Sequence, residues 1–243
     1  MAASVKWEIE DFDEVDSTNT LAVGRPPWSM VRARRQTSGR GRHDRVWVSG
    51  EGGLWFSLVF PVNPANPQVA CLPLVVGLAL YRVCGRLGVQ GLRLRWPNDL
   101  LAGDLKIAGV LLERPAPDRV VIGIGLNLSN HPEQESTELK GMAAALSSLI
   151  PEAPDREKMT RSILDELGGL FQAFETAGFS SLCGEINRCW GGVRNVELEV
   201  DREKLFGEFM GIDSDGNPQL RKPDGRIQAV SGPYVWKLTE IKK

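Results

Sequence analysis

The chain contains one stretch in which glycine alternates with arginine: QTSGRGRHDRVW, from Gln36 to Trp47. The wider segment from residue 32 to residue 45 holds six arginines and a single acid, Asp44, within a chain whose net charge is −2. Glycines let backbone N–H groups turn towards an anion, and arginines add planar, bidentate donors for phosphate or carboxylate. The stretch therefore predicts a loop that closes over an anionic ligand. A solvated charged loop and an RNA-binding Arg-Gly tract are the alternatives.

Length and composition are those of an ordinary globular protein. The 243 residues are 42% hydrophobic and 25% charged, which allows a sizeable core without disulfides or a structural metal. The length fits one large domain, or one medium domain followed by a small one. A net charge of −2 excludes a global basic surface for nucleic acid, so any anion must bind at a local cluster of charge.

The cysteines, the start of the chain and the apolar runs indicate a cellular location. The four cysteines form no Cys-x-x-Cys pair, which favours reduced thiols over a zinc site or a disulfide framework. The first residues are acidic and interrupted, unlike a signal peptide. The longest apolar stretch, Leu72–Val83, is too short to span a bilayer, and we expect Pro73 and Gly77 to break it. We expect a cytoplasmic protein without a membrane segment.

Residues 1–191 alternate between strand and helix patterns. A loose alternation at 5–15 predicts an edge strand, the polar run Asp16–Asn19 predicts the start of a short helix, and the apolar run Gly53–Phe60 predicts a strand covered on both faces. Helical spacing predicts helices at 68–87 and 155–177. Further strands are expected at 29–35, 92–96, 105–113 and 120–128, with another helix at 179–189. Short connections argue against regular right-handed crossovers, so we expect an α+β fold with a mixed sheet packed with helices.

Residues 192–243 follow a break at Gly191-Gly192 and have a different pattern. Five short alternating segments are separated by turn signals such as Asp215-Gly216 and Asp224-Gly225. Such spacing is typical of a small β-barrel. We therefore predict two domains, 1–191 and 192–243. The expected strands of the second domain are 196–200, 205–212, 219–221, 227–230 and 235–238.

A tight turn, Arg95-Trp96-Pro97-Asn98-Asp99, follows one of the predicted strands. It offers an amide and a carboxylate, and Asp99 is a candidate ligand for Mg²⁺ or for a polar group. Ordinary turn chemistry is the alternative, because Pro, Asn and Asp are common in turns.

Lys106 lies within an apolar strand, LKIAGVLL, that starts at Leu105. A lysine in such a strand must reach solvent, pair with an acid or face a polar cavity. Asp104 would lie on the same side of the strand, so a surface ion pair is one explanation. The other is an ammonium group directed at a bound anion.

The next strand ends in GIGLN, from Gly123 to Asn127. Its glycines permit close approach of a ligand, and Asn127 offers a donor and an acceptor. A dinucleotide-binding fingerprint is excluded because its third glycine is missing. With only two histidines, multi-histidine metal sites are excluded too. The sequence contains neither a Gly-x-Ser-x-Gly elbow nor a Gly-x-x-x-x-Gly-Lys-Ser/Thr phosphate loop.

Taken in order, these motifs resemble those of biotin–protein ligases, also called biotin–[acetyl-CoA-carboxylase] ligases. The resemblance extends from about Glu14 to about Leu238 and includes an SH3-like domain at the C-terminus. A lipoate–protein ligase is the nearest alternative. The matching elements are Asp16-Ser17-Thr18-Asn19, Gln36 to Trp47, Arg95 to Asp99, Lys106-Ile107-Ala108-Gly109 and Gly123 to Asn127.

The resemblance implies an ATP-dependent ligase. Biotin and ATP, with Mg²⁺, would give biotinyl-5'-AMP and pyrophosphate, and a lysine of a biotin carboxyl carrier domain would then accept the biotin. The first motif begins at Asp16, so we expect the form without an N-terminal DNA-binding domain, and no DNA partner. Edge strands leave a homodimer open.

The resemblance also implies roles for individual residues. Arg42 and Lys106 would be catalytic, because two anions must be brought together. The residues implied to bind biotin are Ser17, Thr18, Asn19, Gln36, Gly39, Arg40, Gly41, Arg42, Lys106 and Gly109. Those implied to bind ATP are Arg40, Arg42, Trp47, Asn98, Asp99, Lys106 and Asn127, with Trp47 against adenine and Asp99 also as a metal ligand.

Three positions depart from the family's pattern. Asp44 stands where the loop often has glycine, and Arg95 stands where lysine is common. Gly232-Pro233 stands where Gly-Glu is usual. We expect these changes to affect the flexibility of the loop, the geometry of one positive charge and the contribution of the small domain to ATP binding.

Overall fold

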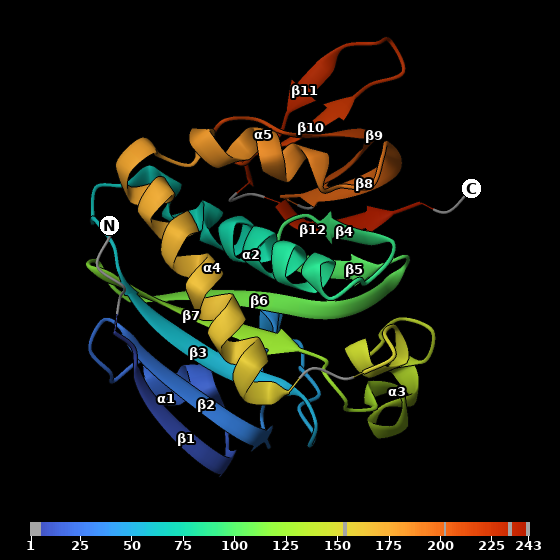
Figure 1. Ribbon diagram of the computed structural model, residues 1–243. Helices are drawn as coiled ribbons and strands as arrows, with labels where there is room; N and C mark the ends of the chain where they lie inside the picture. The colour runs from blue at the N-terminus through green and yellow to red at the C-terminus, as the bar shows by residue number, and fades with distance from the viewer. Residues whose placement is uncertain (1–5, 153–154, 202, 233–234, 242–243) are drawn as a thin grey trace.

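A mixed seven-stranded sheet forms the larger part of the molecule (Figure 1). The computed structural model describes residues 6–152, 155–201, 203–232 and 235–241. Only β1 and β2 are parallel neighbours, and the other pairs are antiparallel. The predicted mixed sheet is confirmed. Its order is β1 (Glu8–Val15), β2 (Ser29–Gln36), β3 (Leu54–Pro61), β7 (Arg119–Leu126), β6 (Leu105–Ala116), β5 (Asp99–Ala102) and β4 (Leu92–Arg95).

The central strand β3 is buried on both faces, as its apolar run predicts. Phe56 and Leu58 belong to the main core on one face, whereas Val59 packs with Ala22 of the short helix α1 (Thr18–Ala22) on the other. Ser57, which alternates with the core residues, therefore lies on the α1 face of the sheet. Its polar side chain is fully buried, so this face must supply hydrogen-bond partners.

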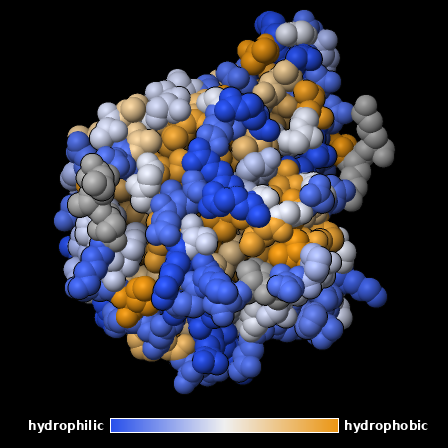
Figure 2. All heavy atoms as spheres, viewed as in Figure 1, coloured by the Kyte–Doolittle hydropathy of each residue, from blue (hydrophilic) through white to orange (hydrophobic). Residues whose placement is uncertain are grey.

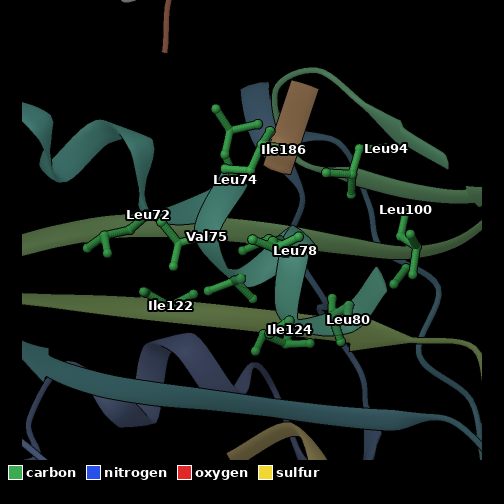
Figure 3. Close-up of a cluster of buried hydrophobic side chains, with 14 of the residues drawn as sticks. Leu72, Leu74, Val75, Leu78, Leu80, Leu94, Leu100, Ile122, Ile124 and Ile186 are labelled. Atoms are coloured by element: carbon green, nitrogen blue, oxygen red, sulfur yellow. The ribbon is translucent and has the colours of Figure 1, made fainter. Parts of the chain in front are cut away.

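Two long helices cover the main core face of the sheet. They are α2 (Leu72–Arg86) and α4 (Arg156–Ala177), which lie in front of the sheet in Figure 1. Leucines of α2 interlock with strand residues such as Ile122 and Ile124 (Figure 3). Asp155 caps α4 by accepting from the N–H groups of residues 157 and 158. The outer side of this layer is mainly hydrophilic, with hydrophobic patches beside it (Figure 2).

Helix α2 is also the most membrane-like segment of the described chain. Together with the 3₁₀ turn at Pro67–Cys71, it forms the one described helical segment long and apolar enough to cross a bilayer, Pro67–Arg86. About three quarters of that window (72%) is buried inside the protein, as in a core helix. The apolar stretch is not broken at Pro73, because this proline lies in the first turn of α2, where no intrahelical N–H is lost.

The β4–β5 hairpin was not predicted as two strands. Asp99–Ala102 follows the Pro-Asn-Asp turn and pairs with both β4 and β6. The pattern favoured a turn alone because four residues give too short a run for periodicity. Pairing places Asp99 opposite Gly109. The remaining short helices are α3 (Pro132–Glu135), α5 (Ser180–Arg188) and the 3₁₀ turns Arg42–Asp44, Thr137–Leu139 and Leu146–Ser148.

A second, antiparallel sheet contains the five C-terminal strands, as predicted. Its order runs from β11 to β12 without a described pairing that closes the ring. It joins the large sheet through Arg93 of β4, whose guanidinium binds both carboxylate oxygens of Glu240 at 2.6 and 2.7 Å. The strands are β11 (Ile227–Ala229), β10 (Pro218–Arg221), β9 (Glu203–Ile212), β8 (Arg194–Val200) and β12 (Val235–Glu240).

Candidate active site

Three glycines let side chains from other elements lie directly on the α1 face of the large sheet. Gly109 of β6 pairs with Gly125 of β7, and Gly123 lies on the same face of β7. A Cβ atom at Gly123 would lie 2.2 Å from Oδ1 of Asn19, and one at Gly125 would lie 2.5 Å from the indole of Trp47. Glycine is therefore required for these two side chains to lie directly on the sheet.

A chain of hydrogen bonds runs from α1 into this face. The Thr18 backbone N–H and hydroxyl both donate to Oε1 of Gln36, at 2.8 and 3.1 Å. The Ser57 hydroxyl lies 2.8 Å from Oγ1 of Thr18 and 2.5 Å from Oδ1 of Asn19. Thr18, Asn19 and Ser57 are all buried. They form a polar wall on this face, which is here called the pocket wall, and hydrogen bonds hold each of its members in place.

Ser17, also buried, stands at the N-cap of α1. Its side chain makes no capping bond, and its backbone N–H donates to Oδ1 of Asp16 at 2.6 Å. The predicted start of this helix is thus confirmed. The side chains of Thr18 and Asn19 contact Ser57 of the sheet, and no side chain caps the helix.

A charged cluster lies next to the glycines. Asp99 holds Nζ of Lys106 at 2.6 Å with one oxygen and Nη2 of Arg95 at 2.6 Å with the other. Burial raises the pKa of the Asp99 carboxyl, but the two cations outweigh burial, so its pKa lies below the ordinary value. Burial lowers the pKa of the Arg42 guanidinium, and Asp99 opposes that change. Two cations therefore share one carboxylate, which leaves a net positive charge that suits the approach of further anions.

Asp99 does not fit the role of a metal ligand in this arrangement. Both of its carboxylate oxygens are engaged by cations. Across residues 6–152, 155–201, 203–232 and 235–241, no group of three or more His, Cys, Asp or Glu residues is placed to hold a metal ion. The carboxylate instead fixes the positions of Lys106 and Arg95.

Trp47 lies over the glycine-lined face. Its indole is in contact range of Gly109 and Gly125, and Nζ of Lys106 lies 4.8 Å from the ring centroid. Its Nε1 is buried without a hydrogen-bond partner. A buried donor without a partner is costly, so this N–H is available to an acceptor that enters the site.

The Gly-Arg loop folds back over the site as a small hairpin. Arg40 and Val46 form an antiparallel bridge, and Trp47 N–H donates to the Gly39 oxygen at 2.9 Å. A Cβ atom at Gly39 would lie 2.3 Å from the Trp47 oxygen, so glycine permits this close approach. Gly41 N–H likewise donates to the Arg45 oxygen at 2.7 Å. The sequence predicts a closing loop, and the structure shows one folded over the sheet.

The tip of this loop has a left-handed backbone. His43 and Asp44 have φ of 55° and 57°, a region that glycine adopts freely and that Asp tolerates better than most residues. The backbone at Asp44 therefore explains why glycine suits this position and why aspartate can replace it. Of the other two departures, Arg95 pairs with Asp99, and Gly232 N–H donates to Oδ1 of Asn217 at 2.8 Å, while Pro233 lies outside the described residues.

Two predicted ATP-binding residues, Asn98 and Asn127, direct their side-chain amides to backbone oxygens of β6. Nδ2 of Asn98 donates to the Val110 oxygen at 2.7 Å. Asn127, which is buried, accepts from Nδ2 of Asn130 at 3.1 Å and places its own Nδ2 3.5 Å from the Lys106 oxygen. Both thus support the strand that carries Lys106. Every other predicted site residue lies on the glycine-lined face, in the loop or in the charged cluster.

Two further residues of this region, Ser57 and Glu113, were not predicted from the sequence. Ser57 is the one hydroxyl in the apolar strand Leu54–Pro61, and this was a usable signal. Glu113 ends the apolar part of β6 and accepts hydrogen bonds from Asn19 and Arg40. Its partners are distant in sequence, so no local pattern identifies it.

Comparison with known proteins agrees with this geometry. Residues 15–127 match the model of the Biotin/lipoate A/B protein ligase family. The biotin–[acetyl-CoA-carboxylase] ligase of Paracoccus denitrificans is 32% identical over 227 residues, which cover 87% of this chain and 93% of that protein. The bifunctional ligase/repressor BirA of Bacillus subtilis is 31% identical over 211 residues, and the match spans 82% of this chain but only 63% of BirA.

Solved structures show the same fold. A biotin protein ligase from Aquifex aeolicus, solved in complex with biotin and ATP, superposes with a TM-score of 0.85 at 28% sequence identity. The superposition covers 96% of this chain and 99% of that one. Residues 15–127, which match the family model, include the Gly-Arg loop, the glycines of the sheet face and the Lys106 cluster. The chain belongs to the Biotin/lipoate A/B protein ligase family and, within it, to the biotin–protein ligases.

Proposed function

We propose that this protein joins biotin to a protein lysine in two steps, the first of which consumes ATP. The observation that carries the proposal is the pair of cations, Lys106 and Arg95, held by Asp99 beside the glycine-lined sheet face. The pocket wall offers hydrogen bonds to the largely uncharged ring of biotin, and the cluster attracts the anionic groups next to it.

The first step brings two anions together. A biotin carboxylate oxygen attacks the α-phosphorus of ATP, the bond from that phosphorus to the bridging oxygen breaks, and pyrophosphate leaves. Lys106 and Arg42 offset the repulsion between carboxylate and phosphate and stabilise charge on the phosphoryl oxygens. Asp99 holds Lys106 in place by a 2.6 Å ion pair, so little reorganisation is needed when the substrates arrive.

The second step transfers the acyl group. The amine of an acceptor lysine attacks the carbonyl carbon of biotinyl-5'-AMP, AMP leaves, and the amine loses a proton as the amide forms. The closed loop keeps water away from the mixed anhydride. Trp47, which lies on Gly109 and Gly125, is placed to pack against the adenylate, and its unpaired Nε1 suits an oxygen acceptor. Mg²⁺ enters as the magnesium complex of ATP.

The acceptor and the setting follow from the same proposal. A biotin carboxyl carrier protein or domain supplies the lysine, and the enzyme acts in the cytoplasm without DNA or membrane partners. Its four cysteines are free thiols, which supports a reducing compartment. We divide the chain into a catalytic domain, 1–191, and an SH3-like domain, 192–243. A homodimer through the outer strand β1 (Glu8–Val15) is supported by its edge position.

The test is pyrophosphate release by the full chain with Mg·ATP, comparing biotin with lipoate. Biotin-dependent release, with little or none from lipoate, is the expected result. Release that depends on lipoate alone would place the chain among the lipoate ligases of the same family. If neither biotin nor lipoate causes pyrophosphate release, the proposal is refuted.

A further inference from the structure

One carboxylate on the glycine-lined face joins the Gly-Arg loop to the pocket wall. Oε2 of Glu113 accepts from Nδ2 of Asn19 at 2.7 Å and from Nη2 of Arg40 at 3.1 Å. Asn19 is buried, whereas the side chain of Arg40 is 44% exposed. Glu113 thus connects a buried residue of the pocket wall with an exposed arginine of the Gly-Arg loop.

The bond to Glu113 determines how the Asn19 amide is turned. Because Nδ2 is held by Glu113, Oδ1 is directed to the Ser57 hydroxyl and lies against Gly123. The two ends of an amide have almost the same shape, so only hydrogen-bond partners select the orientation. Without an acceptor at position 113, the order of donors and acceptors on the pocket wall is no longer fixed.

The same chain of hydrogen bonds reaches the other end of the loop. Beyond Asn19 and Ser57 it continues through Thr18 to Gln36, whose Nε2 donates to Oγ of Ser49 at 2.8 Å. The Ser49 hydroxyl donates to the Trp47 backbone oxygen at 2.9 Å. Arg40 and Trp47, the two sides of the loop, are therefore tied to opposite ends of one network that passes through the pocket wall.

We propose that Glu113 is a positioning residue that couples recognition of the biotin ring to closure of the Gly-Arg loop. It acts through Asn19 on one side and Arg40 on the other, and it takes no part in the chemistry at Lys106. The coupling to biotin rests on the proposed function. The hold on the loop is a property of the free protein and can be measured without any ligand.

Glu113→Gln tests the proposal with little change of shape. The variant keeps an acceptor for Asn19 but loses the charge that attracts Arg40. We expect the biotin KM to rise by a factor of about two to five, because the ion pair between Arg40 and Glu113 is partly exposed and such pairs contribute about 0.2–1 kcal/mol. At saturating biotin, kcat should stay within about threefold, since the cluster at Lys106 is intact. A kcat that falls at unchanged KM would overturn the proposal.

Limited trypsin digestion reads the loop directly. The full-length variant without ligand should be cut faster than wild type after Arg40, Arg42 or Arg45, while its thermal melting stays near that of wild type. Equal cutting rates would overturn the coupling even if biotin activity proves absent. This readout therefore separates failure of the inference from failure of the proposed function.

Two further variants complete the design. Glu208→Gln removes a carboxylate that pairs with Arg221 at 3.2 Å on the C-terminal sheet, and it should leave the biotin KM and loop digestion unchanged. Arg40→Gln combined with Glu113→Gln should cost no more in biotin KM than Arg40→Gln alone. Fully additive effects would show that the two residues act independently and would refute the inference.

Discussion

The ring of His43 stacks on that of Trp236, with centroids 4.6 Å apart and an interplanar angle of 26°. Nε2 of His43 also lies 2.8 Å from the Trp236 backbone oxygen. His43 is at the tip of the Gly-Arg loop, and Trp236 lies in β12 of the C-terminal sheet. The small sheet therefore holds the loop tip from outside, while the pocket network holds its base.

Truncating this contact should loosen the loop. Trp236→Ala removes the stacking partner, so backbone amides near residues 42–46 should exchange hydrogen faster, and biotin-dependent pyrophosphate release should fall several-fold. Trp236→Phe, which keeps an aromatic face, should retain most of the protection. Ile227→Ala changes another exposed hydrophobic residue of the same sheet and serves as control. Unchanged exchange in Trp236→Ala would show that the contact does not restrain the loop.

The left-handed backbone at Asp44 gives a second prediction. At φ of 57°, Asp44→Gly relieves strain and should keep the activity of the wild type. Asp44→Val places a β-branched residue in the same conformation, at a cost of about 1–2 kcal/mol, so the loop should open and activity should fall. Pyrophosphate release by the two variants provides the comparison. Equal activities would mean that the tip does not adopt this backbone in solution.

The glycine-lined sheet face gives a third prediction. Gly123→Ala places a methyl group 2.2 Å from Oδ1 of Asn19, so Asn19 must move and the biotin KM should rise by about tenfold. Gly168→Ala on α4 meets no atom within 4 Å. That control should leave the KM unchanged and increase the free energy of unfolding by about 0.5–1 kcal/mol. A normal biotin KM in Gly123→Ala would show that the pocket wall does not form part of the biotin-binding site.

The depressed pKa of Asp99 gives a pH-dependent prediction. Since its folded-state pKa is below the ordinary value, the charged carboxylate stabilises the fold above the unfolded pKa, and this is lost as pH falls through the folded pKa. Asp99→Asn should lower the free energy of unfolding at pH 7 by about 3 kcal/mol, because two cations lose their partner. The difference between variant and wild type should shrink below about pH 4. Urea unfolding at pH 7 and pH 3 measures both, and equal differences would contradict the assignment.

The sequence predicted those elements whose pattern is long and one-sided. The strand Leu54–Pro61 and the helix Arg156–Ala177 have continuous or periodic apolar residues, and both are present. The strand Asp99–Ala102 was missed because its four residues obtain their pairing from β4 and β6, not from a pattern of their own. Short strands depend on tertiary context in this way.

The same distinction between local patterns and tertiary contacts holds for the residues of the site. The loop, Lys106 and the residues of α1 could be identified from local motifs. The ion pairs of Asp99 could not be predicted, because its partners Lys106 and Arg95 become known only once β5 is placed between β4 and β6. Glu113 was missed because it meets Asn19 across 94 positions of sequence. Contacts of that kind are set by strand register, which single-sequence patterns do not determine.

The central claim is that Lys106 and its charged neighbours form the adenylation site. Exchange of labelled pyrophosphate into ATP, dependent on biotin, tests it most directly. Wild type and Lys140→Ala, a change at an exposed lysine, should exchange at equal rates, whereas Lys106→Ala should be slower by about 100-fold or more. A near-normal rate in Lys106→Ala, or exchange that does not depend on biotin in wild type, would contradict the account.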